Sequence, residues 1–143
     1  MQPILHLSVP VRDLDEARDF YVRAIGCVAA RSREGFCDVW FYGMQLTLQD
    51  RPDEAAVPSA GSRHFGVTLG RDAFDVAVAR LASCGATWLA PVSTDDEGLA
   101  TEQTKGKVVD PSGNVIELKT YKDVEAALEI SLHSYPQSCA HGN

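Results

Sequence analysis

The sequence lacks any apolar run close to the ~20 residues that a membrane-spanning helix needs. Its first residues, Met-Gln-Pro-Ile-Leu-His, include neither the basic segment nor the apolar stretch of a secretory signal. These two absences lead us to expect a cytoplasmic protein with no membrane partner.

Positive charge is also scarce. The chain has 13 basic against 20 acidic residues and a formal net charge of −7. This balance disfavours nucleic acid and anionic membranes as partners, since both need a positive surface. Two local basic pairs, Arg31 with Arg33 and Lys105 with Lys107, either line a pocket or are solvated strand charges.

Cysteine is rare, and its spacing argues against two common kinds of site. The four cysteines, at positions 27, 37, 84 and 139, form no CxxC pair, so the patterns of zinc ribbons and thioredoxins are missing. The first three lie among apolar residues, where a free cysteine behaves as a small hydrophobic side chain. We interpret all four as structural or incidental.

The 143 residues, 45% of them hydrophobic, suffice for one globular domain and are too few for two. We expect this domain to span residues 1–130. Residues 131–143 contain a proline and small polar residues, which is typical of a flexible tail.

The first half of the chain predicts one helix and four strands. Alternating residues indicate a strand at 3–10 that contains His6. Asp13 then provides a helix N-cap, with Glu16 three residues later, and Gly26 ends the helix. The inward helix face is expected to hold Leu14, Ala17, Phe20, Tyr21 and Ile25. Three antiparallel strands follow at residues 27–31, 37–42 and 44–49.

After a linker at residues 51–62, the same order recurs. A strand at 63–69 contains His64, and a helix opened by Asp72 is ended by Gly85. This helix should turn Phe74, Val76, Val78 and Leu81 inward. Three more strands are expected at 86–90, 106–109 and 115–120, a polar loop at 93–104, and a last helix at 121–130. The repeat indicates two βαβββ modules, at about 3–50 and 63–120, produced by duplication.

Three segments of the chain resemble the vicinal oxygen chelate superfamily of glyoxalases, bleomycin-resistance proteins and extradiol dioxygenases. They begin at His6 (His-Leu-Ser-Val-Pro-Val-Arg-Asp), at Arg63 (Arg-His-Phe-Gly-Val) and at Asp110 (Asp-Pro-Ser-Gly-Asn-Val-Ile-Glu-Leu-Lys). The resemblance covers about residues 4–120. It implies an α+β fold in which two βαβββ modules form a half-open mixed β-barrel around a divalent metal ion.

Carried over position by position, the resemblance implies His6, His64 and Glu117 as the metal ligands. Thr47 stands where a fourth ligand would be, and Gln45 or Gln49 on the same strand face could take its place. Two imidazoles and a carboxylate suit Mn²⁺, Zn²⁺, Ni²⁺ or Co²⁺, and they most resemble the sites of non-haem iron, so Fe²⁺ is favoured. Taken singly, each ligand is more typical of a hydrogen-bonded core residue. Their positions on equivalent strands favour the metal site.

The resemblance implies a metal-dependent enzyme whose small-molecule substrate chelates the ion through vicinal oxygens. We expect a dioxygenase-like oxidoreductase or a glyoxalase-like lyase or isomerase. The candidate catalytic residues are Glu117, Tyr42 and Lys119, the last two as acids or bases beside the metal. Tyr42 is alternatively a core residue, and Lys119 a solvated one. A pocket is expected to be lined by Phe20, Trp40, Tyr42, Trp88 and the loop at 93–104.

Several alternatives stay open on the same scaffold. Thr47 weakens a glyoxalase I assignment, which needs a second carboxylate there. Thiol transferases of the fosfomycin type usually carry a tyrosine just before the Asp-Pro turn, where this chain has Lys107-Val108-Val109. The alternative from another class of function is a bleomycin-resistance protein, which binds a drug without catalysing a reaction. Such binding proteins usually lack the three metal ligands. Because half-barrels pair edge to edge, we expect a homodimer.

Overall fold

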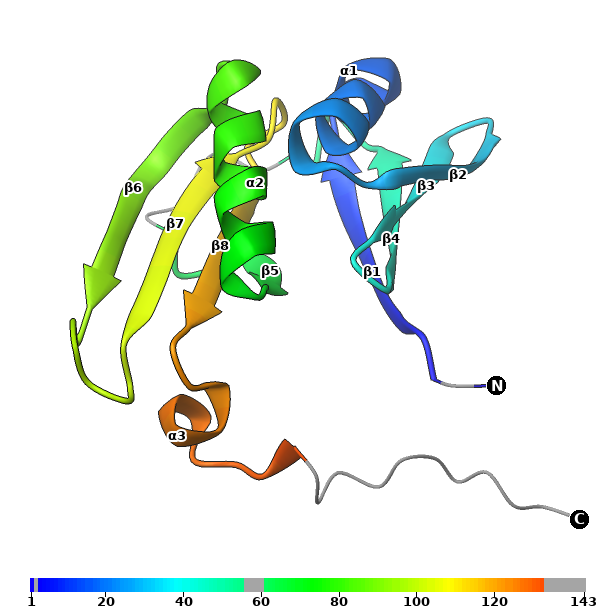
Figure 1. Cartoon of the computed structure of the whole chain (residues 1–143). Coiled ribbons are helices and arrows are strands. Elements are labelled where there is room, and N and C mark those ends of the chain that lie inside the picture. Colours follow the sequence, from blue (N-terminus) through cyan, green and yellow to red (C-terminus); the bar gives the residue numbers. More distant parts are fainter. Residues whose placement is uncertain (2, 56–60, 133–143) are drawn as a thin grey trace, which may run out of the picture.

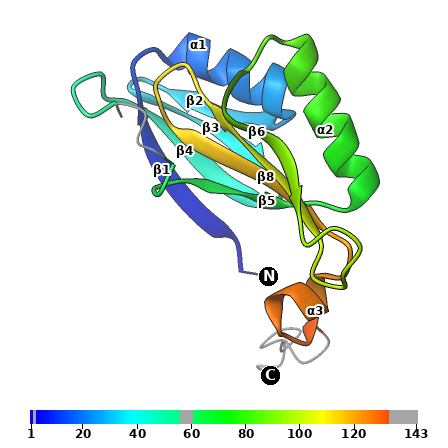
Figure 2. The same cartoon turned by 90° about the vertical axis from the view of Figure 1, so that its left-hand side faces the viewer.

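The computed structural model describes residues 1, 3–55 and 61–132, and it consists of two four-stranded sheets with helices between them (Figure 1). The first module comprises β1 (Leu5–Val11), α1 (Leu14–Asp19), a π-helical segment η1 (Phe20–Ile25), β2 (Val28–Arg33), β3 (Phe36–Phe41) and β4 (Met44–Asp50). The second comprises β5 (Phe65–Thr68), α2 (Arg71–Ser83), β6 (Thr87–Asp95), β7 (Gln103–Val109) and β8 (Val115–Tyr121). A short helix α3 (Val124–Leu128) follows, beyond the end of β8 and away from α1 and α2 (Figure 2).

The two sheets have the same topology. Their strand orders are β1-β4-β3-β2 and β5-β8-β7-β6. In each sheet the first strand runs parallel to the last, and the other neighbours are antiparallel. The predicted α+β fold of two βαβββ modules is therefore confirmed, and the sheets stay open as a half-open barrel requires.

Local signals start and stop the helices as the sequence predicts. Asp13 caps α1, and its side chain accepts a hydrogen bond from the Glu16 backbone N–H at 2.8 Å. Gly26 ends η1 with φ of 92°, a left-handed conformation that glycine adopts without strain. No helix of the described residues is long and apolar enough to cross a membrane.

One hydrophobic core joins both modules. It is formed by the helix faces and the inward sides of the sheets, for example by Leu46 on β4 and Ile116 on β8, both fully buried. The rings of Phe41 and Phe65 also touch edge to face across the modules, with centroids 5.5 Å apart. Val76 was predicted to point inward but is 58% exposed. It follows Phe74 by two residues, which turns it to the opposite side of a 3.6-residue helix.

A tight turn after β7 holds the modules together. The buried carboxylate of Asp110 accepts hydrogen bonds from the Tyr21 hydroxyl at 2.9 Å and from the backbone N–H of Ser112 at 2.8 Å. The side-chain amide of Asn114 donates to the Pro10 carbonyl at 3.0 Å. The bonds of Tyr21 and Pro10 join the first module to this turn, and the helices α1 and α2 lie between the two sheets (Figure 1).

Two expectations about the second module need correction. The polar loop predicted at 93–104 is confined to residues 96–102, since β6 and β7 pair as far as Asp95 and Gln103. The hairpin is stabilised at this end by an ion pair of 2.8 Å between Lys105 and Asp95, so the polar residues at 93–95 and 103–104 belong to strands. His64 precedes β5 instead of lying within it.

The chain ends also differ from the expected boundaries. The helix predicted at 121–130 is shortened to α3, because Tyr121 still belongs to β8 and Asp123 provides the N-cap. Most of the predicted tail, residues 133–143, lies outside the described residues, as do residues 56–60 of the predicted linker.

Candidate metal centre

Glu117 lies at the middle of β8, on the sheet face that points away from the core. Its neighbours Ile116 and Leu118 point into the core, and the Glu117 side chain is only 7% exposed. Lys119 Nζ lies 2.8 Å from Glu117 Oε2, and His64 Nε2 lies 3.5 Å from the same oxygen. The structure thus brings together two of the three predicted metal ligands.

Electrostatics keep Glu117 ionised. Burial alone would raise the pKa of its carboxyl group, but the hydrogen bond from Lys119 and the positive charges of Lys119, His64 and Lys107 lower it below its ordinary value. The pKa of Lys119 is raised, because its bond to Glu117 outweighs the effect of burial. Glu117 is therefore an anion at neutral pH and Lys119 an ammonium.

The imidazole of His64 is oriented by the backbone. Its Nδ1 lies 2.5 Å from the Gly61 carbonyl oxygen. A carbonyl oxygen only accepts hydrogen bonds, so Nδ1 carries a proton, and Nε2 is the nitrogen that faces Glu117. Metal-binding histidines typically show this arrangement, with the far nitrogen donating to a carbonyl or carboxylate.

His6 lies in the other sheet. It pairs with Gln45 across β1 and β4, and it is exposed on the polar face of the first module. Among the residues that the structure describes, no group of three or more His, Cys, Asp or Glu side chains is arranged to hold a metal ion. One chain therefore does not bring His6 to His64 and Glu117.

The first module has a buried carboxylate that the sequence analysis missed. Asp38 on β3 is 3% exposed. Its carboxylate accepts hydrogen bonds from Thr47 Oγ1 at 2.6 Å, Arg31 Nε at 2.5 Å and Gln45 Nε2 at 3.0 Å. The signal available in the sequence was a lone acidic residue between Cys37 and Val39 in an apolar strand. Thr47 and Gln45, proposed as alternative fourth ligands, thus serve Asp38.

The sequence matches the model of a family described as a glyoxalase-like domain over residues 6–119. The chain belongs to this family. No curated protein matches this glyoxalase-like chain. A solved structure from Alicyclobacillus acidocaldarius, described as a glyoxalase/bleomycin resistance protein/dioxygenase, is 34% identical with a TM-score of 0.79, and the match covers 88% of this chain and 96% of the other.

More distant structures share the fold of the glyoxalase-like chain. The fosfomycin resistance protein FosX of Listeria monocytogenes is 12% identical with a TM-score of 0.73, covering 89% of this chain and 98% of FosX. A FosX variant solved with Mn(II) and 1S,2S-dihydroxypropylphosphonic acid is 14% identical with a TM-score of 0.70, covering 90% and 97%. The chain therefore has the fold of the vicinal oxygen chelate superfamily, which includes metalloenzymes.

Other predicted site residues of the glyoxalase-like protein lie elsewhere. Tyr42 stands at the β3–β4 turn with φ of 47°, and its hydroxyl donates to the Ile25 carbonyl at 3.0 Å. Burial raises the pKa of this phenol, although Arg80 opposes the shift. Phe20 and Trp88, expected to line the pocket, pack against the core instead. Phe20 lies on the core side of η1, as the helix pattern also predicted, and Trp88 lies on the core side of β6.

Proposed function

We propose that this glyoxalase-like protein is a divalent-metal-dependent enzyme whose small-molecule substrate binds the ion through two adjacent oxygen atoms. The observation that carries the proposal is the pairing of His64 Nε2 with the ionised, almost buried Glu117. Burying an anion costs free energy unless a cation compensates its charge. On this sheet face Lys119 compensates the charge of Glu117 in part. The proposed ligands are His6, His64 and Glu117.

The site is proposed to form between two subunits. His6 is exposed on the polar face of the first sheet, while His64 and Glu117 lie on the polar face of the second. Because the helices and the shared core lie between the sheets, these faces point away from one another within one chain (Figure 1). A homodimer with two-fold symmetry can place the first sheet of one subunit against the second sheet of its partner, twice.

The donor set fits a first-row divalent ion. Two imidazole nitrogens and one carboxylate suit Fe²⁺, which we favour, and also Mn²⁺, Zn²⁺, Ni²⁺ or Co²⁺. Among the described residues, none donates a hydrogen bond to Glu117 Oε1, so this oxygen is available while Lys119 holds Oε2. When bound, the ion would act as a Lewis acid toward the substrate oxygens and, if it is iron, also as a platform for O₂.

The chain's own groups have distinct parts in this proposal. The Gly61 carbonyl orients His64, and Glu117 supplies the negative charge. Lys119, whose raised pKa keeps a proton on Nζ, is proposed to donate a hydrogen bond to a substrate oxygen. We therefore propose Lys119 as a hydrogen-bond donor at neutral pH, and not as a base. Tyr42 bonds to its own module's backbone, so we no longer include it among the catalytic groups.

The test is metal analysis of the protein purified without added metal and then loaded with Fe²⁺ under anaerobic conditions or with Mn²⁺. We expect close to one ion per chain in the wild type and loss of most of it in His64→Ala. Removing a direct ligand should weaken metal binding by more than the ~10 to 100-fold that an outer-shell change typically costs. The neighbouring variant Arg63→Ala is the matched control and should retain the metal.

Equal, near-zero occupancy in the wild type and in His64→Ala would contradict the proposal. It would instead favour the drug-binding type of function, in which the protein binds a ligand without chemistry. Oxygen uptake with a panel of catechols then separates the reaction types. Uptake supports a dioxygenase, and metal binding without uptake supports a lyase or isomerase.

A further inference from the structure

The polar face of the first sheet contains a second feature that the metal proposal does not use. A cavity of about 480 Å³ lies above β1 and β4 and reaches the β2–β3 hairpin. This volume is within the range of small-molecule sites. Its lining includes His6 and Ser8 on the edge strand β1, Thr47 and Gln49 on β4, and Arg31 on the opposite edge strand β2. Arg31 therefore shares a cavity with a proposed metal ligand.

A β-bulge in β2 turns Arg31 toward this cavity. Ala29 pairs with Val39 and Ser32 with Cys37, so two residues of β2 stand opposite the single residue Asp38 of β3. With regular pairing, position 31 would lie opposite Cys37 and share its core-facing side. The extra residue shifts Arg31 to the polar face, beside Asp38. Bulges commonly redirect a side chain in this way next to binding sites.

Asp38 and Phe36 then hold the guanidinium in one orientation. Arg31 Nε donates to Asp38 Oδ2 at 2.5 Å, and Asp38 is itself fixed by Thr47 and Gln45. The Arg31 Cζ atom lies 5.2 Å from the centre of the Phe36 ring, a cation–π contact. In the described part of the chain, neither terminal nitrogen of Arg31 makes a hydrogen bond. These two nitrogens form the end of the fork that binds carboxylates and phosphates in a bidentate manner.

We propose that Arg31 binds an oxyanion group of the substrate, a carboxylate or a phosphonate, at the end of the cavity opposite His6. Asp38 is the positioning residue that holds Arg31 for this contact. This inference rests on the proposed function, because only that function makes the bound anion part of the enzyme's substrate. A substrate that chelates a metal beside His6 and carries an anionic group at its other end would span the cavity.

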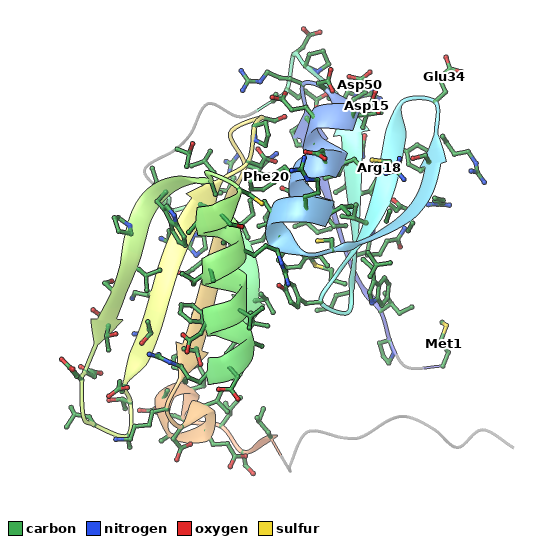
Figure 3. The ribbon with its side chains drawn as sticks, turned by 45° about the horizontal axis from the view of Figure 1, so that its top comes forward. Met1, Asp15, Arg18, Phe20, Glu34 and Asp50 are labelled. Atoms are coloured by element: carbon green, nitrogen blue, oxygen red, sulfur yellow. The ribbon has the colours of Figure 1, made fainter. Side chains whose placement is uncertain are left out.

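Other charges around the cavity are engaged or peripheral. Arg51 donates to the Asp50 carbonyl and lies 4.0 Å from Glu54, so it is turned to its own segment. Glu34 is exposed at the tip of the β2–β3 hairpin, and its side chain points away from the sheet (Figure 3). Arg31 is thus the cation whose fork is open to the cavity, although the whole chain carries a net charge of −7.

The test is an NMR titration of the full-length, metal-free protein. Methylphosphonate and glycolate are the two anionic probes, and 1,2-propanediol is the neutral control. The signals followed are the Arg31 side-chain Nε–H and the backbone amides of His6 and Ser8. We expect saturable shifts with at least one anion and none with the diol. The anion that binds more tightly identifies the group as phosphonate or carboxylate.

Variants test whether the oriented guanidinium of Arg31 is the group that binds the anion. Arg31→Gln should raise the Kd at least about tenfold, and Arg31→Lys should restore only part of the affinity, because it keeps the charge and loses the fork. Arg33→Gln is the matched control, two residues along the same strand. Its guanidinium donates to the Ser32 carbonyl, and its loss should change the Kd less than about twofold. Asp38→Asn should raise the Kd and shift the Arg31 Nε signal while the Mn²⁺ affinity stays unchanged.

An equal loss in Arg31→Gln and Arg33→Gln, or no saturable shift with either anion, would overturn this inference. Its failure is distinct from failure of the proposed function. Loss of metal binding with anion binding intact would overturn only the metal proposal. Metal binding without any effect of Arg31 on the anions would overturn only the oxyanion site.

Discussion

The two modules of this protein share their topology and core, but the buried carboxylate in each module has different hydrogen-bonding and ion-pair partners. In the first module Asp38 accepts hydrogen bonds from Thr47, Arg31 and Gln45. In the second, Glu117 has an ion pair with Lys119 and a more distant His64. Glu117 stands at the position equivalent to Thr47, since Thr47 pairs with Ser8 and Glu117 with Gly66.

This difference separates a structural carboxylate from one that can bind a ligand. Three donors engage both oxygens of Asp38, so each of its oxygens already accepts a hydrogen bond within the protein. Glu117 keeps an oxygen without a donor among the described residues, and an oriented imidazole stands beside it. The duplicated fold thus provides the same sheet twice, with different polar residues on it. In our proposal the second sheet provides His64 and Glu117 as metal ligands, and the first provides His6 and the oriented Arg31.

The largest expected loss of stability concerns the hydrophobic core that the two modules share. Leu46→Ala and Ile116→Ala remove equivalent, fully buried side chains from β4 and β8. Each should lower the free energy of unfolding by about 2–5 kcal/mol, because the core is common to both modules. Urea denaturation at a fixed protein concentration measures this. A loss confined to one variant would show two separate cores and contradict the shared one.

A smaller loss of stability is expected at Gly66, which pairs with Glu117, and at Ser8, its equivalent in the first sheet. A Cβ added at Gly66 would lie 1.9 Å from the Glu117 backbone oxygen, so Gly66→Ala must displace β5 or β8. We expect a loss of about 1–3 kcal/mol in unfolding free energy. Ser8→Ala at the equivalent position of the first sheet should cost only about 0.5 kcal/mol, because Ser8 is exposed. Equal costs in the two variants would contradict the close approach at Gly66.

The smallest effect is a dependence of stability on pH. The pKa of Glu117 is lowered in the folded protein, so its contribution to stability is present above the ordinary value of 4.5 and is lost as the pH falls through the folded pKa. Glu117→Gln should therefore flatten the decline of stability below about pH 4.5. Asp38→Asn should do the same in the first module, since its pKa is lowered too. Unfolding curves measured over this acid range test both, and an unchanged decline in Glu117→Gln would contradict the account.

Much of the fold could be predicted from the sequence, because local signals determined it. Asp13 and Gly26 delimit the first helical segment as their chemistry predicts. The recurrence of a histidine strand, a helix and three strands indicated the two modules. Polar strands were harder, since the cross-strand pairs of Thr94 with Thr104 and Asp95 with Gln103 depend on a partner that periodicity does not show.

The site was predictable only in part. His64 and Glu117 meet, because β5 pairs with β8 and the residue just before β5 therefore lies beside the middle of β8. The Arg31–Asp38 pair depends on a β-bulge, and no pattern in the sequence marks where a strand gains an extra residue. The position of Tyr42 depends on its hydrogen bond to Ile25, a contact between segments 17 residues apart.

The most direct test of the proposed shared metal site mixes two inactive variants. His6→Ala and Glu117→Ala are each expected to lose metal as homodimers. After subunit exchange, a mixed dimer has one damaged site and one intact site, because the intact site takes His6 from one chain and His64 with Glu117 from the other. Statistical exchange should restore about a quarter of the wild-type metal content. If all three ligands came from the same chain, the mixture would bind no more metal than the separate variants, and this result would contradict the account.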